Sequence, residues 1–443
     1  MSQALAYVLG IAVMVVGIAV SVALHELGHM LPAKKFGVKV PEYFIGFGPR
    51  LWSVRRGETE YGVKALWLGG YVKLVGMLPP ENPDRPDRRT SSGELGMVGQ
   101  ARADSMEEIA PGEEDRAFYR LSVPRKLVVM AGGILTNLVL GVVLLAVSLG
   151  VVGVPTSTSS LASVAPCVSS DIDAGAPCTE EDPVSPAARA GLEPGDRIIS
   201  WNGVPVSTWQ QVTAQIERAG TTPTEVVVER DRARRTVSVT AVEVERAVRD
   251  DQGSPVTDST GTALTRSRPY VGLSPASETR RVPLGELPGM VGQAVGGTLR
   301  AIATLPVGLY HVVAAGLGLE ERSTTGVIGL VGLGRHAGQV SSAGVGEGTV
   351  SLSARVSAML SLLGSLNLAL FAFNLVPLLP LDGGHVAGAC WEGLRRRWAA
   401  ARGRPDPGPV DIARLLPVSQ VVVALLVVMA VVLVWADLVA PVT

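Results

Sequence analysis

The chain has 443 residues, of which 47% are hydrophobic and 18% are charged. This balance is too apolar for an ordinary soluble protein and too charged for a chain that lies entirely in lipid. We therefore expect several transmembrane helices and at least one water-exposed domain. The formal net charge of −1 excludes the strong positive field that nucleic acid binding requires.

Four apolar stretches are long enough to cross a membrane as helices. They cover residues 5–24, 127–153, 354–379 and 418–440. The first has no basic residues before it and no A-x-A cleavage site, so we interpret it as a retained helix and not as a signal peptide.

Basic residues predict the orientation of these helices. They cluster at 34–39, after the first helix, and at 395–414, before the last. Both clusters are expected in the cytoplasm, so the two termini and the long segment 154–350 lie outside a multi-pass protein of the cell membrane. The stretch 296–318 is apolar too, but Arg300 and its glycines favour an interfacial amphipathic segment on the outer leaflet over a fifth crossing.

The chain has three cysteines and no CxxC spacing, which argues against a cysteine-based zinc or redox site. Cys167 and Cys178 lie close together in the segment expected outside, and Cys390 stands alone. A disulfide between the first two is plausible there, although the sequence alone leaves it open.

A water-exposed domain is indicated by "SPAARAGLEPGDRIISWNGVPVSTW", residues 185–209. A turn, two short strands around Asn202-Gly203, a helix and a further hairpin are expected in order. The GLxxGDxIxxxNG string resembles PDZ domains, and the resemblance covers about residues 156–275. Such α+β domains accept an extended peptide by strand addition. The residues of the groove are unknown, and a small β-rich domain without a ligand is the alternative.

The stretch "HELGH", residues 25–29, ends the first apolar helix. HExxH places His25 and His29 one helical turn apart on one face, so both can bind one Zn²⁺. Glu26 can then act as the general base. Two polar side chains at a helix end would be the simpler explanation, but ionisable groups at membrane depth indicate function.

Two histidines leave a tetrahedral zinc site incomplete, and the next ligand is expected from another helix at the same depth. "NLVPLLPLDGGH", residues 374–385, ends the third apolar helix, which runs in the same direction as the first. We predict Asp382 as this ligand, with His385 as a less favoured alternative. Pro377 and Pro380 indicate irregular backbone that lines a cavity.

With these motifs the chain resembles the site-2 protease family, in its RseP-like bacterial branch. "YFIGFGPRLWS" and "GETEYGVKALWLGGYVKLVGM" resemble the cytoplasmic-side β-hairpin region of that family, and "AGGILTN" resembles its GxxxN motif, here Gly133 and Asn137. Two positions depart from the family pattern, with Trp67 and Ile134 where proline is common. Neither is a predicted ligand.

The resemblance implies a zinc-dependent endopeptidase that cleaves single-span membrane proteins, such as anti-sigma factors, after a first cut outside. The residues implied in substrate binding are Asn374, Asn137 and the hairpin run Leu68, Gly69 and Gly70. The hairpin edge could pair with an unwound substrate. It could also be purely structural, and Asn137 could be a helix-packing contact.

The resulting fold prediction is a four-helix membrane protein with a membrane-associated β-hairpin region and one extracytoplasmic PDZ-like domain. Its predicted segments are 1–32 with HELGH, the β region 33–78, a flexible cytoplasmic loop 79–122, the second helix 123–153, the PDZ-like domain 154–280, the interfacial segment 281–350, the third helix 351–390, a cytoplasmic loop 391–416 and the fourth helix 417–443.

Two other classes of protein are less consistent with this sequence. An inactive membrane scaffold would have no need of Glu26 beside its histidines. A zinc transporter would carry polar residues along several helices, and the second and fourth apolar stretches have almost none.

Overall fold

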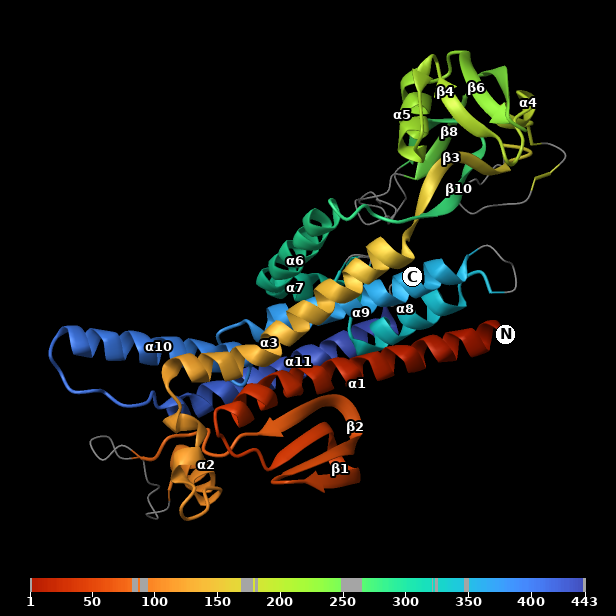
Figure 1. Cartoon of the computed structure of the whole chain (residues 1–443). Coiled ribbons are helices and arrows are strands. Elements are labelled where there is room, and N and C mark those ends of the chain that lie inside the picture. Colours follow the sequence, from red (N-terminus) through yellow and green to blue (C-terminus); the bar gives the residue numbers. More distant parts are fainter. Residues whose placement is uncertain are drawn as a thin grey trace. The chain divides into compact units, whose positions relative to one another are not determined.

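The computed structural model describes residues 2–81, 87, 95–168, 178–179, 182–247, 265–320, 322, 326–345 and 350–440. The chain divides into two compact units (Figure 1). Unit 1 is formed by the chain before residue 153 and most of the chain from 282 onward, and unit 2 by Gly153–Arg281. Each unit is described by itself.

Unit 1 is mostly helical. Its helices are α1 (Gln3–Lys35), α2 (Met97–Glu107), α3 (Val123–Ala146, continued by a π-helical segment Val147–Val152), α6 (Leu287–Ala303), α7 (Leu305–Gly316), α8 (Leu330–Ser342), α9 (Leu352–Asn374), α10 (Asp382–Ala401) and α11 (Leu416–Val439). In the described chain, α1, α3, α9 and α11 are long and apolar enough to cross a membrane. These four helices match the four predicted apolar stretches, and the bent pair α6 and α7 would raise the number to five if it formed one span.

The structure differs from the predicted segments in two places. The expected third helix, 351–390, is divided, because α9 ends at Asn374 and α10 begins at Asp382. Pro377 and Pro380 lie between them and have no backbone N–H to continue a helix. As a result α10 extends through the first part of the expected loop 391–416.

The other difference concerns a segment that was expected to be a flexible loop. The predicted flexible loop 79–122 contains α2. The predicted interfacial segment 281–350 contains α6, α7 and α8, and the first two of these meet at a bend of 70°. By length and composition this bent pair is compatible with a broken span or a re-entrant loop, and the interfacial location of 281–350 stays a prediction.

Glycines allow α1 and α3 to cross closely. A Cβ atom on Gly132 of α3 would lie 1.9 Å from the carbonyl oxygen of Gly28 on α1, which no larger residue could tolerate. The same crossing places the two histidines of α1 directly against α3, so small residues at this point position the candidate site.

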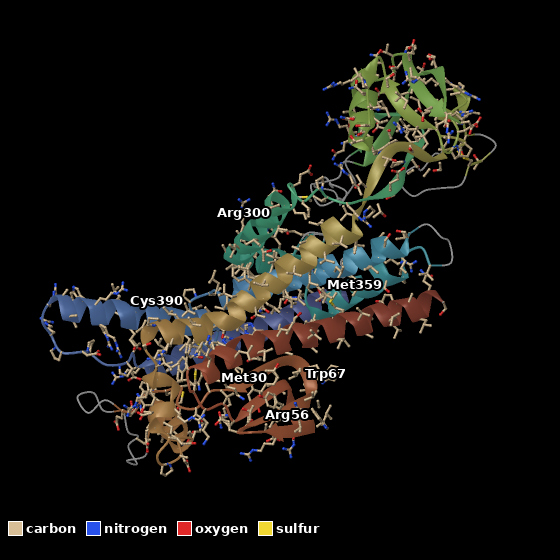
Figure 2. All side chains as sticks on the ribbon, viewed as in Figure 1. Met30, Arg56, Trp67, Arg300, Met359 and Cys390 are labelled. Carbon is tan, nitrogen blue, oxygen red and sulfur yellow. A yellow bond between two sulfur atoms is a disulfide. The ribbon has the colours of Figure 1, made fainter. Side chains whose placement is uncertain are left out.

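The β-hairpin of unit 1 consists of two long, bent strands, β1 (Glu42–Arg56) and β2 (Thr59–Lys73). Residues 42–45 pair with 60–63 on one side and with 70–73 on the other. The run 70–73 therefore lies at an edge of this small sheet. Near the far end of the hairpin, large apolar side chains such as Trp67 are exposed (Figure 2).

Unit 2 contains a sheet with strand order β10-β3-β4-β6-β7, with β5 paired to β4, and a separate β8-β9 pair. The strands are β3 (Val154–Val164), β4 (Arg197–Trp201), β5 (Val204–Pro205), β6 (Thr224–Arg230), β7 (Ala233–Val239), β8 (Val242–Ala247), β9 (Thr265–Tyr270) and β10 (Leu273–Arg280), and the helices are α4 (Pro186–Arg189) and α5 (Trp209–Ala219). Thr208 and Gln211 form a capping box that starts α5. The apolar face of α5 packs on a core around Trp201 and Ile198.

Candidate metal centre

Three side chains from α1 and α10 converge on one point. The Nε2 atoms of His25 and His29 lie 3.3 Å apart, and they lie 3.2 and 3.3 Å from Oδ2 of Asp382. With metal–ligand bonds of about 2.0–2.1 Å, the edges of a tetrahedron are about 3.3–3.4 Å long. The three atoms therefore have the spacing of three corners of a tetrahedral zinc site. We call them the ligand triangle.

The surroundings of the ligand triangle favour a cation at its centre. Oδ2 of Asp382 is buried and accepts no hydrogen bond from the described chain. Its nearest polar neighbours are the two imidazole nitrogens. A carboxylate oxygen and two nitrogen lone pairs that face one another repel unless a positive charge lies between them, so the donor set fits Zn²⁺.

A hydrogen bond to α3 fixes the tautomer of His29. Its Nδ1 lies 2.8 Å from the carbonyl oxygen of Val129, which can only accept. Nδ1 therefore carries the proton, and the lone pair of Nε2 points into the ligand triangle. Such a second hydrogen bond is typical of histidines that bind metal.

Gly133 of α3 lies directly behind both histidines. A Cβ atom there would be 2.2 Å from Nε2 of His29 and 2.7 Å from Cε1 of His25. Only glycine therefore fits between α3 and the ligand triangle, which gives a physical reason for the glycine of the GxxxN motif.

Glu26 lies between the ligand triangle and the hairpin edge. A Cβ atom on Gly70 of β2 would lie 3.4 Å from the Cγ atom of Glu26, so the base of this side chain lies against the hairpin edge. Tyr43 of β1 donates a hydrogen bond of 2.6 Å to the carbonyl oxygen of Ala23 and so attaches the hairpin to α1. A carboxylate that directly follows His25 of the ligand triangle thus lies beside an exposed strand edge.

The sequence profile of Peptidase family M50 matches residues 13–405 of the chain. The chain belongs to the site-2 protease family. It is 35% identical over 450 residues to zinc metalloprotease Rip1 of Mycobacterium tuberculosis strain H37Rv and 32% identical over 448 residues to Rip1 of Mycolicibacterium smegmatis, with 98% of each chain covered in both comparisons. A putative zinc metalloprotease of Rhizobium meliloti is 27% identical over 402 residues, with 88% of this chain and 87% of the relative covered.

Membership of the site-2 protease family confirms three predictions. The chain is a zinc metalloprotease, its cofactor is Zn²⁺, and it is a multi-pass membrane protein.

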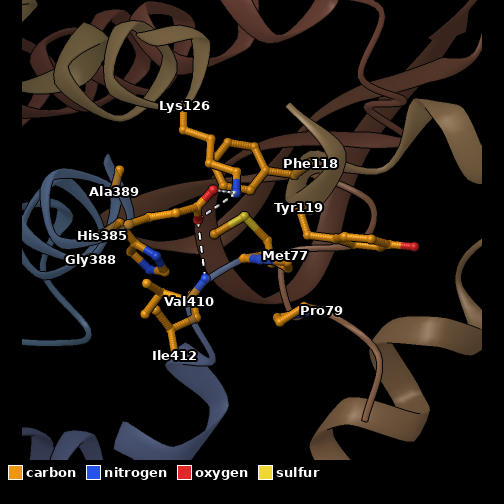
Figure 3. A pocket seen from close by; sticks show the side chains of 12 residues that line it. Met77, Pro79, Phe118, Tyr119, Lys126, His385, Gly388, Ala389, Val410 and Ile412 are labelled. Atoms are coloured by element: carbon orange, nitrogen blue, oxygen red, sulfur yellow. Dashed lines mark hydrogen bonds and ion pairs between the residues drawn. The ribbon is translucent and has the colours of Figure 1, made fainter. Parts of the chain in front are cut away.

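His385, the alternative ligand, lies one turn after Asp382 on α10 and does not belong to the ligand triangle. It lines a small cavity of about 30 Å³, together with Lys126 and Glu392 (Figure 3). This volume can hold a water molecule. The structure therefore places Asp382, and not His385, beside the two histidines.

Sequence reasoning missed the ion pair of that cavity. Nζ of Lys126 on α3 lies 2.9 Å from Oε2 of Glu392 on α10, and both side chains are more than nine-tenths buried. Glu392 also accepts a hydrogen bond from the backbone N–H of Val410. The pair holds α10 against α3 and so helps to place Asp382. No sequence motif marks either Lys126 or Glu392.

The predicted substrate-binding residues are divided between several elements. Leu68, Gly69 and Gly70 lie in β2, at or beside the edge that faces Glu26. Asn374 is the last residue of α9, just before the irregular segment that leads to Asp382. Asn137 of α3 does not face open space, because its amide contacts His25.

Proposed function

We propose that this zinc metalloprotease hydrolyses peptide bonds within the membrane and that its substrates are single-span membrane proteins. The observation that carries the proposal is the position of the ligand triangle. Two of its members lie on α1, an apolar helix long enough to cross a membrane. A water-soluble metalloprotease would have no need to build its centre on such a helix.

His25, His29 and Asp382 would hold the metal, and Glu26 would move the protons. Bound Zn²⁺ supplies a Lewis acid that activates water and polarises the scissile carbonyl. The carboxylate of Glu26 accepts the proton of the attacking water and then donates it to the nitrogen of the leaving amine. Glu26 directly follows the ligand His25 in α1, which supports this assignment.

The hairpin edge would present the substrate to Glu26. A transmembrane helix hides its peptide bonds in internal hydrogen bonds, so it must unwind before it is cut. The unpaired backbone groups of the run 70–73 can receive such an extended segment as an added strand. Leu68, Gly69 and Gly70 would line its path, and Asn374 would bind its backbone from the end of α9.

We further propose that unit 2 is a PDZ-like domain and that it lies outside the cytoplasm. Both termini of the chain would lie on the same side of the membrane. A disulfide joins Cys167 and Cys178 of unit 2, as expected for an extracytoplasmic segment. Unit 2 would admit only substrates whose outer part another protease has already removed. Membrane-bound regulators such as anti-sigma factors would then be released into the cytoplasm.

Cleavage by the full chain in liposomes tests this function. The substrate is a single-span protein already shortened on its outer side. Glu26→Gln is expected to lower the rate of cleavage by about 10²–10⁴-fold while the zinc content stays unchanged, because only the proton acceptor is lost. Glu107→Gln, the same change on the exposed surface of α2, is the matched control. Cleavage by Glu26→Gln at the wild-type rate would contradict the mechanism.

A further inference from the structure

We propose that Asn137 is a positioning residue for His25 and not a substrate-binding residue. Its amide oxygen accepts a hydrogen bond from Nδ1–H of His25, and this bond keeps Nε2 of His25 directed at the metal. This inference rests on one part of the proposed function, namely that the ligand triangle binds zinc.

The contact between these two residues is direct and buried. The amide nitrogen position of Asn137 lies 3.0 Å from Nδ1 of His25, and only 1% of Asn137 is exposed. Asn137 follows Gly133 by one helical turn on α3, so both face α1. A side chain buried in this way, with one end on a metal ligand, is poorly placed to meet a substrate.

The chemistry of the histidine decides which end of the amide faces it. When Nε2 binds a metal, Nδ1 carries the proton and needs an acceptor. The amide oxygen can accept this proton and the amide nitrogen cannot, so a half turn of the amide that brings Oδ1 to Nδ1 is required. The other end of the amide has no partner in the described chain. The hydrogen bond to His25 therefore determines the orientation of the Asn137 side-chain amide.

Helix α3 would thus orient both histidines in the same way, with a hydrogen-bond acceptor that faces Nδ1 of each ring. Val129 gives its carbonyl oxygen to Nδ1 of His29, and Asn137, about two turns later, gives its side-chain oxygen to Nδ1 of His25. Gly133 lies between the two and leaves room for both rings. In the GxxxN motif, Asn137 would then orient His25, and Gly133 would leave space for the rings of both histidines.

Zinc affinity of the full chain, measured by competition with a chelator, tests the proposal without any need for cleavage. Asn137→Leu removes the acceptor, and we expect the affinity for zinc to fall about 10–100-fold. Asn137→Asp keeps an acceptor at nearly the same place, and we expect it to bind zinc within a few-fold of the wild type. If the leucine variant does not fold, Asn137→Ala takes its place with the same expectation.

A second buried asparagine provides the matched control. Asn367 of α9 is fully buried and donates a hydrogen bond of 3.0 Å to Oγ of Ser21, one turn before His25 on α1. Asn367→Leu removes a similar amide contact to α1 that touches no ligand, so the zinc affinity should stay unchanged. The visible absorption of the Co²⁺-substituted protein should change in Asn137→Leu and not in Asn367→Leu, because only the first alters the ligand geometry.

The outcomes separate this proposal from the proposed function. If Asn137→Leu binds zinc with wild-type affinity and shows the wild-type Co²⁺ spectrum, Asn137 does not position His25. If the Asn137→Leu and Asn367→Leu variants lose zinc equally, the effect is general helix packing, and the proposal is also wrong. A wild-type chain that binds no stoichiometric zinc would instead contradict the proposed function.

Discussion

The ligand triangle of unit 1 and the ion pair of Asp196 in unit 2 both bury a carboxylate, but they satisfy it differently. Asp196 is fully buried and receives hydrogen bonds of 2.6 and 2.8 Å from the guanidinium of Arg230 and one of 3.0 Å from the backbone N–H of Glu193. Oδ2 of Asp382 receives none from the described chain.

This difference shows how a structural carboxylate can be told from a functional one. A buried carboxylate costs free energy unless charges or donors compensate it. At Asp196 the protein supplies that compensation itself. The same holds in unit 1 for Glu392 with Lys126 and for Asp437 with Arg322. At Asp382 only two imidazole nitrogens lie close, which fits its proposed role as a ligand of a bound cation.

The largest effect is expected from filling the space behind the ligand triangle. Gly133→Ala puts a methyl group 2.2 Å from the present position of Nε2 of His29, so the ring must move. We expect loss of stoichiometric zinc and of cleavage, measured by elemental analysis and by the liposome assay. The matched control is Gly292→Ala on α6, where a methyl group meets nothing within 4 Å. Full zinc content in Gly133→Ala would show that the histidines are not confined by α3.

A smaller effect is expected at the hairpin edge, which contacts the base but no ligand. The Cβ atom of Gly70→Val would lie 2.9 Å from Cγ1 of Val22 and from the carbonyl oxygen of Phe44, and 3.4 Å from Cγ of Glu26. We expect cleavage to slow by about tenfold, because a displaced edge misplaces the substrate. Zinc content should not change. If zinc is lost as well, the edge supports the metal centre and not only the substrate.

The smallest effect on zinc binding and cleavage is expected from a substitution of Asp196. Asp196→Asn should lower the unfolding midpoint of unit 2 by about 5–10 °C and leave zinc content unchanged. Burial alone would raise the pKa of Asp196, but the guanidinium of Arg230 and the N–H of Glu193 hold this pKa below its usual range.

The lowered pKa of Asp196 determines whether the stability of unit 2 rises or falls with pH. Its contribution to stability is complete above the usual carboxyl pKa and is lost as the pH falls through the lowered pKa of the folded state. The midpoint of unit 2 should therefore fall on acidification, and Asp196→Asn should flatten that slope. The measurement is calorimetry of the full chain from pH 7 to acid. If Asp196→Asn leaves the pH dependence of the unfolding midpoint unchanged, other groups control that dependence.

The sequence predicts the parts of the site that depend on local spacing. HELGH places two histidines on one helical face whatever the rest of the fold does. The choice of Asp382 followed from the expected depth and direction of the two helices, and the structure brings it within 3.2 Å of His25.

Other features depend on contacts between distant residues, which local patterns do not encode. The pair of Lys126 and Glu392 joins residues 266 positions apart, and the carbonyl oxygen of Val129 belongs to no motif. The sequence does not predict the length of α10, because a run of arginines beside an apolar helix is typical of a cytoplasmic loop. In the structure they continue a helix that the Lys126–Glu392 pair holds against α3.

The zinc content of Asp382→Ala and His385→Ala tests the ligand triangle most directly. Each variant of the full chain is purified, dialysed against a weak chelator and analysed for metal per chain. The proposed ligand set predicts that the wild type and His385→Ala keep one zinc, whereas Asp382→Ala loses it. Stoichiometric zinc in Asp382→Ala, together with its loss from His385→Ala, would contradict the assignment of Asp382.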